Sequence, residues 1–516
     1  MRKKIIIMGA GVGGLTVAHL LINSKQNFEI HIIERNDEVG GLARSRRLPN
    51  DLHSEYCWHV IGKNYHNLWK IMKEIPYENK TVADNLVPIR QYIYGRENDN
   101  EPLDEINSSF LCSGSIIKYC KALHKMGTLK DVTLYDLIKL LEITSICNTS
   151  SLEMLKHYDS ILWKDFTKHM SAEAKKWITD SPAIYLGMDI DKLSAHTMLH
   201  LLRPIIEDET KYDFYSFDGS FNDKWFEPWK KNLSWLGVIF HKGTIDRIKV
   251  IDDEIQYVSI NSEKMMGHVY INALSVESLA LLVPRYRELS CKSVQIQTQV
   301  LYYINKKLKF KYPSILIFPD TPWCIMVRPE GMLWKYPTIS EESQLNTQTD
   351  FDYKDILSTG IGIWSRPGIL HKKPAIECTI DEIKEECWYQ IRRSKRLCDY
   401  IETESDEHSS FDNFSNVQVL HADIWDSFTY RNDQIETWEP KFSNNVGTLK
   451  LRPTSDDLHI KNLKHATAYT QTNANIFNME SACEAGCRVA NSLDPELKFF
   501  DKRDKPTFGF KFIQSL

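Results

Sequence analysis

Residues 5–21 read IIIMGAGVGGLTVAHLL, and this stretch decides the fold. Its β-branched residues predict a short strand, Lys4–Met8, and the apolar residues after the glycines predict a helix, Leu15–Asn23. Four glycines stand between them: Gly9, Gly11, Gly13 and Gly14. Glycine destabilises a continuous helix, so the run is not expected to be a signal peptide or a membrane anchor. A second strand, Glu29–Ile33, follows, and strand, glycine turn, helix and strand together predict a Rossmann-like α/β domain.

Each glycine of this motif has a physical task in binding a dinucleotide. Gly9 permits the tight turn, Gly11 lets the backbone approach a pyrophosphate, and Gly14 lets the helix pack closely on the strand, with Gly13 between them. The free N–H groups at the helix start hold phosphate oxygens. Glu34 ends the second strand, where its carboxylate can accept hydrogen bonds from ribose hydroxyls. An acid at this position disfavours the 2′-phosphate of NADP.

A second glycine pair, Gly40-Gly41, follows Glu34 in the segment ERNDEVGGLARS. This arrangement resembles the extended FAD fingerprint of the flavin amine oxidase superfamily, which includes monoamine and polyamine oxidases, phytoene desaturases and, more distantly, UDP-galactopyranose mutases. The resemblance implies that Gly40, Gly41 and either Arg44 or Ser45 approach the pyrophosphate and ribityl chain. Leu42 stands where many relatives carry Arg or Lys, so the phosphate contacts of this chain are expected to differ.

Residues 462–493 resemble the closing FAD motif of the same superfamily. The resemblance implies a helix, Met479–Leu493, whose N-terminus at Met479 and Glu480 faces the flavin pyrimidine. Glu480 has an alternative role as a first-turn acid that stabilises the helix. Thr467 lies in the turn where relatives commonly have Gly-Asp. In the middle of the chain, Ile245 stands where relatives place an apolar residue against the adenine.

The resemblance also implies the domain organisation. We expect a Rossmann-like FAD-binding domain built from three segments and interrupted by an α+β substrate domain built from two. The FAD-binding segments are 1–75, 216–290 and 411–516, and the substrate segments are 76–215, mainly helical, and 291–410, strands plus a helix. The polar segment at 402–410 is expected to be a solvated loop.

The expected activity is that of an FAD-dependent oxidoreductase, in which a hydride moves from a C–N or C–C bond of a small organic substrate to flavin N5. Two alternatives remain open: a redox-neutral flavin-dependent isomerase or mutase, and a non-catalytic FAD-binding protein. Tyr469 and Trp425 are candidates for aromatic rings beside the flavin, with core packing as the alternative role for each. His59 and His66 are expected to be ordinary histidines rather than metal ligands.

Composition supports a small-molecule partner. The chain has 516 residues, a net charge of -5 and interspersed charges, which gives no electrostatic reason to bind nucleic acid. Its 11 cysteines are scattered without a CxxC pair, which predicts free thiols in a reducing, cytoplasmic compartment and no zinc site. No apolar stretch predicts a transmembrane segment, although a lipid substrate would bring the chain to a membrane surface. Oligomeric state has no signal in the sequence.

Overall fold

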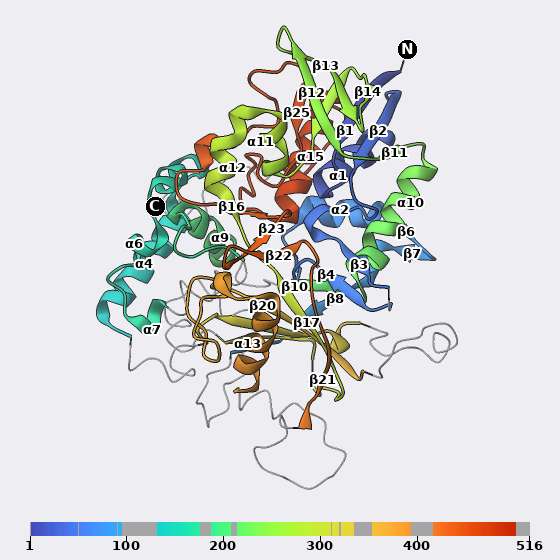
Figure 1. The fold of residues 1–516 in the computed structure, drawn as a ribbon. Coiled ribbons are helices and arrows are strands. Elements are labelled where there is room, and N and C mark those ends of the chain that lie inside the picture. The colour runs from blue at the N-terminus through green and yellow to red at the C-terminus, as the bar shows by residue number, and fades with distance from the viewer. Residues whose placement is uncertain are drawn as a thin grey trace.

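A computed structural model describes most of the chain (Figure 1). The described residues are 2–49, 51–89, 91–94, 132–175, 187–207, 214–310, 312–318, 321–334, 353–393 and 416–501. The loop expected at 402–410 lies outside them.

A five-stranded parallel sheet forms the first layer, in the order β11-β2-β1-β15-β25. Its strands are β1 (Lys3–Met8), β2 (Phe28–Glu34), β11 (Ile239–Lys242), β15 (Val269–Asn272) and β25 (Leu463–His465). Ile5, Ile7, Ile30 and Ile32 are fully buried, because a parallel sheet of this kind is covered on both faces. The sheet therefore draws strands from the beginning, middle and end of the chain.

Helices α1 (Val12–Ile22), α2 (His66–Glu74) and α15 (Met479–Leu493) pack together beside this sheet. The helix predicted at Leu15–Asn23 begins three residues earlier, inside the glycine run, because Gly13 and Gly14 take part in the first turn. The α15 prediction is confirmed at both ends. Small residues set how closely the helices approach: a Cβ on Gly486 would lie 2.7 Å from the carbonyl oxygen of Gly13.

Between the first and last parts of the sheet, the chain forms helix α10 (Glu227–Trp235), strand β11 and an antiparallel meander before β15. The meander consists of β12 (Ile245–Ile251), β13 (Glu254–Ile260) and β14 (Glu263–Met265). Two short helices, α11 (Val276–Leu282) and α12 (Arg287–Ser293), follow β15.

A six-stranded sheet forms a second body, in the lower part of Figure 1, in the order β21-β17-β20-β19-β18-β9. Its strands are β9 (Gln91–Tyr94), β17 (Gln299–Ile304), β18 (Ser314–Phe318), β19 (Ile325–Pro329), β20 (Asp355–Ile361) and β21 (Val419–Ile424). Helix α13 (Ile380–Arg392) shares a buried apolar cluster with the sheet through Ile383, Cys387 and Ile391. The expected boundary at residue 411 falls too early, because β21 pairs with β17 and belongs to this sheet. Pairing between strands so distant in sequence has no local signal.

A group of helices completes the described chain: α4 (Leu134–Thr149), α5 (Leu152–Leu155), α6 (Trp163–Phe166), α7 (Ala172–Lys175) and α9 (Ala195–Glu207). They share a core around Trp163 and Met198. A small sheet of β5 (Ile61–Gly62), β10 (Phe214–Phe217) and β8 (Leu86–Ile89) also forms. Four separate two-stranded sheets pair β3 (Ser45–Arg47) with β4 (His53–Glu55), β6 (Pro76–Tyr77) with β7 (Lys80–Thr81), β16 (Val294–Gln295) with β24 (Lys441–Phe442), and β22 (Phe428–Arg431) with β23 (Gln434–Thr437). Across the described part of the chain, no helix combines the length and apolar character needed to span a bilayer.

Candidate functional site

One cavity of about 1220 Å³ opens at the carboxyl ends of the parallel strands. All five strands of the first sheet contribute residues to its lining: Gly9 after β1, Glu34 on β2, Gly243 after β11, Ala273 after β15 and Ala466 after β25. Open α/β sheets bind ligands at this edge. The volume exceeds the roughly 300–1,000 Å³ of common ligand pockets, so the cavity is large enough for a ligand of dinucleotide size.

The Gly9–Gly11 turn and the Gly40-Gly41 pair lie side by side in the cavity wall. Gly11 and Gly40 form an isolated β-bridge, and Gly9, Gly40 and Gly41 adopt positive φ angles of 103°, 115° and 61°. A Cβ on Gly11 would have no atom closer than 3.9 Å, that atom being the Cα of Gly41. The space beside Gly11 is therefore open to a ligand, as expected for a residue that lets a phosphate approach the backbone.

Gly13 and Gly14 have a different surrounding. A Cβ on Gly13 would lie 1.9 Å from the carbonyl oxygen of Ala466, and one on Gly14 would lie 2.4 Å from that of Gly9. Gly13 borders the cavity, whereas Gly14 is absent from its lining. Both residues serve close packing, of α1 against the β25–α15 turn and of α1 against β1.

Glu34 ends β2 with its carboxylate in the cavity lining. Its Oε2 accepts from the backbone N–H of Ala10 (2.8 Å), and Oε1 accepts from the N–H (2.9 Å) and the Nδ2 (3.1 Å) of Asn36. These bonds hold the carboxylate still at the place where the motif puts a ribose. Ile245 lies close by in the lining, at the start of β12.

Arg44 is buried against an acid that sequence reasoning missed. Its Nη2 donates to Glu439 Oε1 at 2.6 Å, while Arg35 donates to the same oxygen at 3.2 Å. Although burial opposes ionisation, Arg44 helps to lower the pKa of Glu439. Trp425 donates to Glu439 Oε2 and stacks under Arg44 and Arg46, with their guanidinium carbons 5.0 and 4.5 Å from its ring centre. Arg44 and Glu439 line the cavity; Trp425 does not, and it packs beneath them.

Ser45 also lies behind the cavity wall rather than in its lining. Its hydroxyl accepts from the N–H of Asn222, and its own N–H donates to the side-chain oxygen of Asn222. This reciprocal pair fixes the chain that leaves the second glycine pair. The geometry therefore gives Ser45 a supporting role in the wall.

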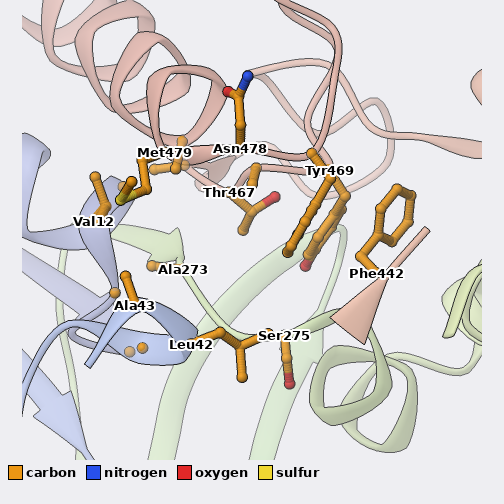
Figure 2. A pocket seen from close by; sticks show the side chains of 18 of the residues that line it. Val12, Leu42, Ala43, Ala273, Ser275, Phe442, Thr467, Tyr469, Asn478 and Met479 are labelled. Atoms are coloured by element: carbon orange, nitrogen blue, oxygen red, sulfur yellow. The ribbon is translucent and has the colours of Figure 1, made fainter. Parts of the chain in front are cut away.

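The N-terminus of α15 meets the cavity at Asn478, Met479 and Glu480. The Asn478 side chain caps the helix by accepting from the N–H of Ser481 at 2.8 Å. In Figure 2, Met479 points toward Val12 and Thr467 lies near the centre of the view. The first N–H groups of a helix lack partners within the helix, and with the positive end of the dipole they favour a negatively charged group.

Glu480 has a second set of contacts. Its carboxylate accepts from the backbone N–H of Asn67 (3.1 Å) and Leu68 (3.0 Å), the first turn of α2, and from Asn67 Nδ2 (3.0 Å). Burial raises the pKa of Glu480 to about 8 in spite of these donors. Glu480 therefore ties α15 to α2, and both helix starts border the cavity.

Tyr469 presents its ring, and not its hydroxyl, to the cavity. The hydroxyl donates to the carbonyl oxygen of Leu274 (3.0 Å) and accepts from Asn272 Nδ2 (2.9 Å). Burial raises the pKa of this hydroxyl well above its usual value. The ring is stacked on Phe442, with ring centres 5.6 Å apart, and Figure 2 shows the two side by side.

Six aromatic and aliphatic side chains also line the cavity. They are Leu152, Trp58, Val60, Tyr65, Leu201 and Phe214. His59 and Lys441 lie among the lining residues as well, and burial lowers the pKa of His59 to about 3 and that of Lys441 below its usual value. Within the described ranges no three histidine, cysteine or acidic side chains come together as a metal site.

The residues present fit a dinucleotide such as FAD. The open space at Gly11 is a cradle that a Cβ would occupy, Glu34 offers carboxylate oxygens, and the α15 N-terminus offers N–H groups. In addition, Nε of Arg44 is buried without a hydrogen-bond partner in the described structure, on a side chain that borders the cavity.

Comparisons with known proteins agree with this geometry. A family model described as an NAD(P)-binding Rossmann-like domain matches residues 7–75. A zeta-carotene desaturase, chloroplastic/chromoplastic, of Capsicum annuum is 24% identical over 213 residues, or 38% of this chain and 34% of the desaturase. The match thus spans about a third of that relative's length.

Solved structures match nearly the whole chain. A putrescine oxidase bound to putrescine has a TM-score of 0.58 and 12% identity, over 96% of this chain and 99% of the oxidase. A CLA-producing fatty acid isomerase from P. acnes has a TM-score of 0.56 and 15% identity, over 96% of this chain and 98% of the isomerase. This chain has the fold of these solved structures. The predicted α/β class, with a Rossmann-like domain interrupted by a second body, is confirmed.

Sequence reasoning missed three residues in or beside the cavity wall: Glu439, Asn272 and His465. Asn272 was visible as the end of a strand, but its partner His465 lies 193 residues away. A polar residue at the end of a buried strand was the only signal, and by itself it does not name a partner.

Proposed function

We propose that this chain binds FAD noncovalently and is an oxidoreductase that converts a C–N or C–C single bond of a small organic substrate to a double bond, with a hydride leaving carbon for flavin N5 and a proton leaving the neighbouring atom. The observation that carries the proposal is the convergence of four features on one cavity. They are the turn with Gly9 and Gly11, the Gly40-Gly41 pair, Glu34 and the start of α15. Bound there, FAD supplies the hydride-accepting chemistry.

The residues of this chain have distinct parts in that proposal. Gly9, Gly11 and the Gly40-Gly41 pair hold the pyrophosphate, Glu34 holds the ribose, and Ile245 contacts the adenine. Backbone N–H groups at Met479 face the flavin pyrimidine, where the helix dipole stabilises the negative charge that builds on reduction. Thr467 contributes a hydroxyl in the turn before α15.

The lining favours an apolar substrate and a C–C bond over a cationic amine. Three carboxylates in the lining already accept hydrogen bonds from protein groups. Glu439 accepts from the side chains of Arg44, Arg35 and Trp425. Glu480 accepts from the start of α2, and Glu484 accepts from the backbone N–H groups of Asn473 and Ala474. Trp58, Val60, Tyr65, Leu152, Leu201 and Phe214 add aromatic and aliphatic surface to the lining. Apolar walls exclude water and hold a hydrocarbon near the flavin.

An anaerobic reduction experiment tests the proposal. The FAD-loaded chain is mixed with putrescine, cyclohexylamine, a C18 fatty acid and a polyene, each in turn, and loss of the oxidised flavin absorption is followed. Reduction by an apolar C–H donor, with the dehydrogenated product identified, is the expected result. A flavin that none of the substrate classes reduces would contradict an oxidoreductase of this type.

A redox-neutral isomerase is the second candidate, favoured by the likeness in fold to the fatty acid isomerase. It is distinguished by product and by flavin state. An isomerised product that has the mass of the substrate, with the flavin unchanged after each turnover, would assign this alternative. A loaded chain that converts neither class would be an FAD-binding protein without catalysis.

A further inference from the structure

A buried chain of hydrogen bonds runs beside the cavity, at the carboxyl ends of β15 and β25. Its members are Asp457, His465, Asn272 and Tyr469, and their side chains are at most 2% exposed. Asn272 and His465 are paired neighbours on the two strands. Of these four residues only Tyr469 lines the cavity. The series of hydrogen bonds therefore connects the cavity wall to the carboxylate of Asp457, which lies outside the lining.

Asp457 determines which atoms donate and which accept in this series of hydrogen bonds. Its carboxylate accepts from the backbone N–H groups of His459 and Ile460, both at 2.8 Å, and from the hydroxyl of Tyr286 at 2.7 Å. Although burial opposes ionisation, these bonds and His465 lower the pKa of Asp457 below its usual range. The ring of His465 therefore donates its Nε2–H to Asp457 Oδ2, at 2.8 Å.

With the proton on Nε2, Nδ1 of His465 is an acceptor, and it takes a hydrogen from Asn272 Nδ2 at 3.0 Å. The other amide hydrogen goes to the Tyr469 hydroxyl at 2.9 Å, and Asn272 Oδ1 accepts from the N–H of Leu274 at 3.2 Å. Tyr469 in turn donates to the carbonyl oxygen of Leu274. One orientation of one amide thus joins two cavity-lining residues, Leu274 after β15 and Tyr469 after β25.

We propose that His465 is a positioning residue: its neutral Nε2–H form holds Asn272 in the orientation that fixes Tyr469 and Leu274, and thereby sets the affinity of the cavity for FAD. This goes beyond the proposed function and rests on it for the identity of the ligand. His465 contacts no ligand itself and acts through Asn272.

Protonation of His465 would change its Nδ1 from a hydrogen-bond acceptor to a donor. A hydrogen on Nδ1 would face the amide hydrogens of Asn272, donor against donor, and relief by rotation of the amide would break the bonds to Tyr469 and Leu274. The charged and titratable groups that face the ring are Asp457, Tyr286, Arg285 and Asp456.

Burial outweighs Asp457 and lowers the pKa of His465, so the ring is neutral at neutral pH. FAD affinity is therefore expected to be full at neutral pH and to fall in acid, as the pH drops below the ordinary histidine value of 6.5.

Two matched variants test this. His465→Asn keeps an oxygen acceptor near the Nδ1 position but does not titrate, whereas His465→Leu has a side chain of similar size with no acceptor. The dissociation constant for FAD is measured from pH 5 to 8 by flavin fluorescence on the full chain. At neutral pH we expect the leucine variant to bind at least about tenfold more weakly and the asparagine variant within about threefold of wild type. The asparagine variant should also lose part of the wild-type decline in acid.

Hydrogen exchange on the ligand-free chain gives a second measurement that needs no FAD. The amide of Leu274 should exchange faster in His465→Leu than in wild type and keep its protection in His465→Asn. Tyr469→Phe, which removes only the hydroxyl, should weaken FAD binding in the same direction and serves if the leucine variant does not fold.

The outcomes separate this inference from the proposed function. Equal FAD affinity and equal Leu274 protection in wild type and the leucine variant would overturn the inference. An unchanged acid decline in the asparagine variant would overturn it too. A wild-type chain that binds no FAD would contradict the proposed function. The exchange measurement would still decide whether His465 orders the cavity wall at Leu274.

Discussion

Replacing Gly11 by alanine should leave the fold intact and remove most of the affinity for FAD. The new Cβ would have Gly41 Cα at 3.9 Å and the carbonyl oxygen of Ala273 at 4.0 Å as its nearest neighbours, which are ordinary contacts. Gly11 has φ −73° and ψ 174°, an extended conformation that alanine adopts freely. Lower entropy of the unfolded chain stabilises the variant by about 0.4–1 kcal/mol, and a poorer helix N-cap offsets this by a similar amount. The free energy of unfolding should therefore change by less than about 1 kcal/mol.

The methyl group would instead occupy the space through which a pyrophosphate approaches the backbone. Steric exclusion of one phosphate contact that involves a charged group costs about 1.5–3 kcal/mol, or roughly 10- to 150-fold in affinity. Calorimetric titration of the flavin-free chain with FAD measures this, and thermal unfolding of the same samples measures the fold.

Gly13→Ala is the matched control. Its Cβ would lie 1.9 Å from the carbonyl oxygen of Ala466, so α1 or the turn after β25 must move. We expect a loss of unfolding free energy of about 1–3 kcal/mol or more. If Gly11→Ala lowers stability as much as Gly13→Ala does, or binds FAD as wild type does, the division of the glycines into ligand-facing and packing roles is wrong.

Three further predictions concern acids and the α15 helix. Glu34→Ala should weaken FAD binding by about 1–3 kcal/mol with the fold kept, because ribose hydroxyls lose their acceptor; unchanged affinity by calorimetry would contradict the role of Glu34. Met479→Asp should lower the two-electron potential of bound FAD by roughly 20 mV, for an opposing interaction of about 1 kcal/mol near the flavin, and an unshifted midpoint in potentiometric titration would rule out the placement of α15. Burial raises the pKa of Glu480 to about 8, so its contribution to stability is present below the unfolded value near 4.5 and is lost as pH rises toward 8; Glu480→Gln should flatten that decline in chemical denaturation, and parallel pH profiles would refute it.

The parts of the fold that the sequence predicted are those with local causes. The β-branched run of β1, the glycine turn and α15 each have their signal within a few neighbouring residues, and the structure has them in the expected order. The start of α1 was misplaced because glycine is a poor helix former, while Gly13 and Gly14 are helical here for the sake of close packing.

Long-range features could not be predicted in this way. Whether β21 joins the sheet of β17 depends on strand pairing across the chain, and the partner of Arg44 is Glu439, 395 residues away. The motif suggested a phosphate contact for Arg44, and the structure adds an ion pair with Glu439 in the cavity wall. The orientation of Tyr469 likewise depends on Asn272, which ends β15 and lies 197 residues earlier in the chain.

The most direct test of the account is the identity of the small molecule that the purified full-length chain carries or binds. We expect heat or acid to release intact FAD, identified by mass, at up to one equivalent per chain and with no flavin left on the protein. A homogeneous, folded preparation that binds NAD and rejects FAD would contradict the central claim.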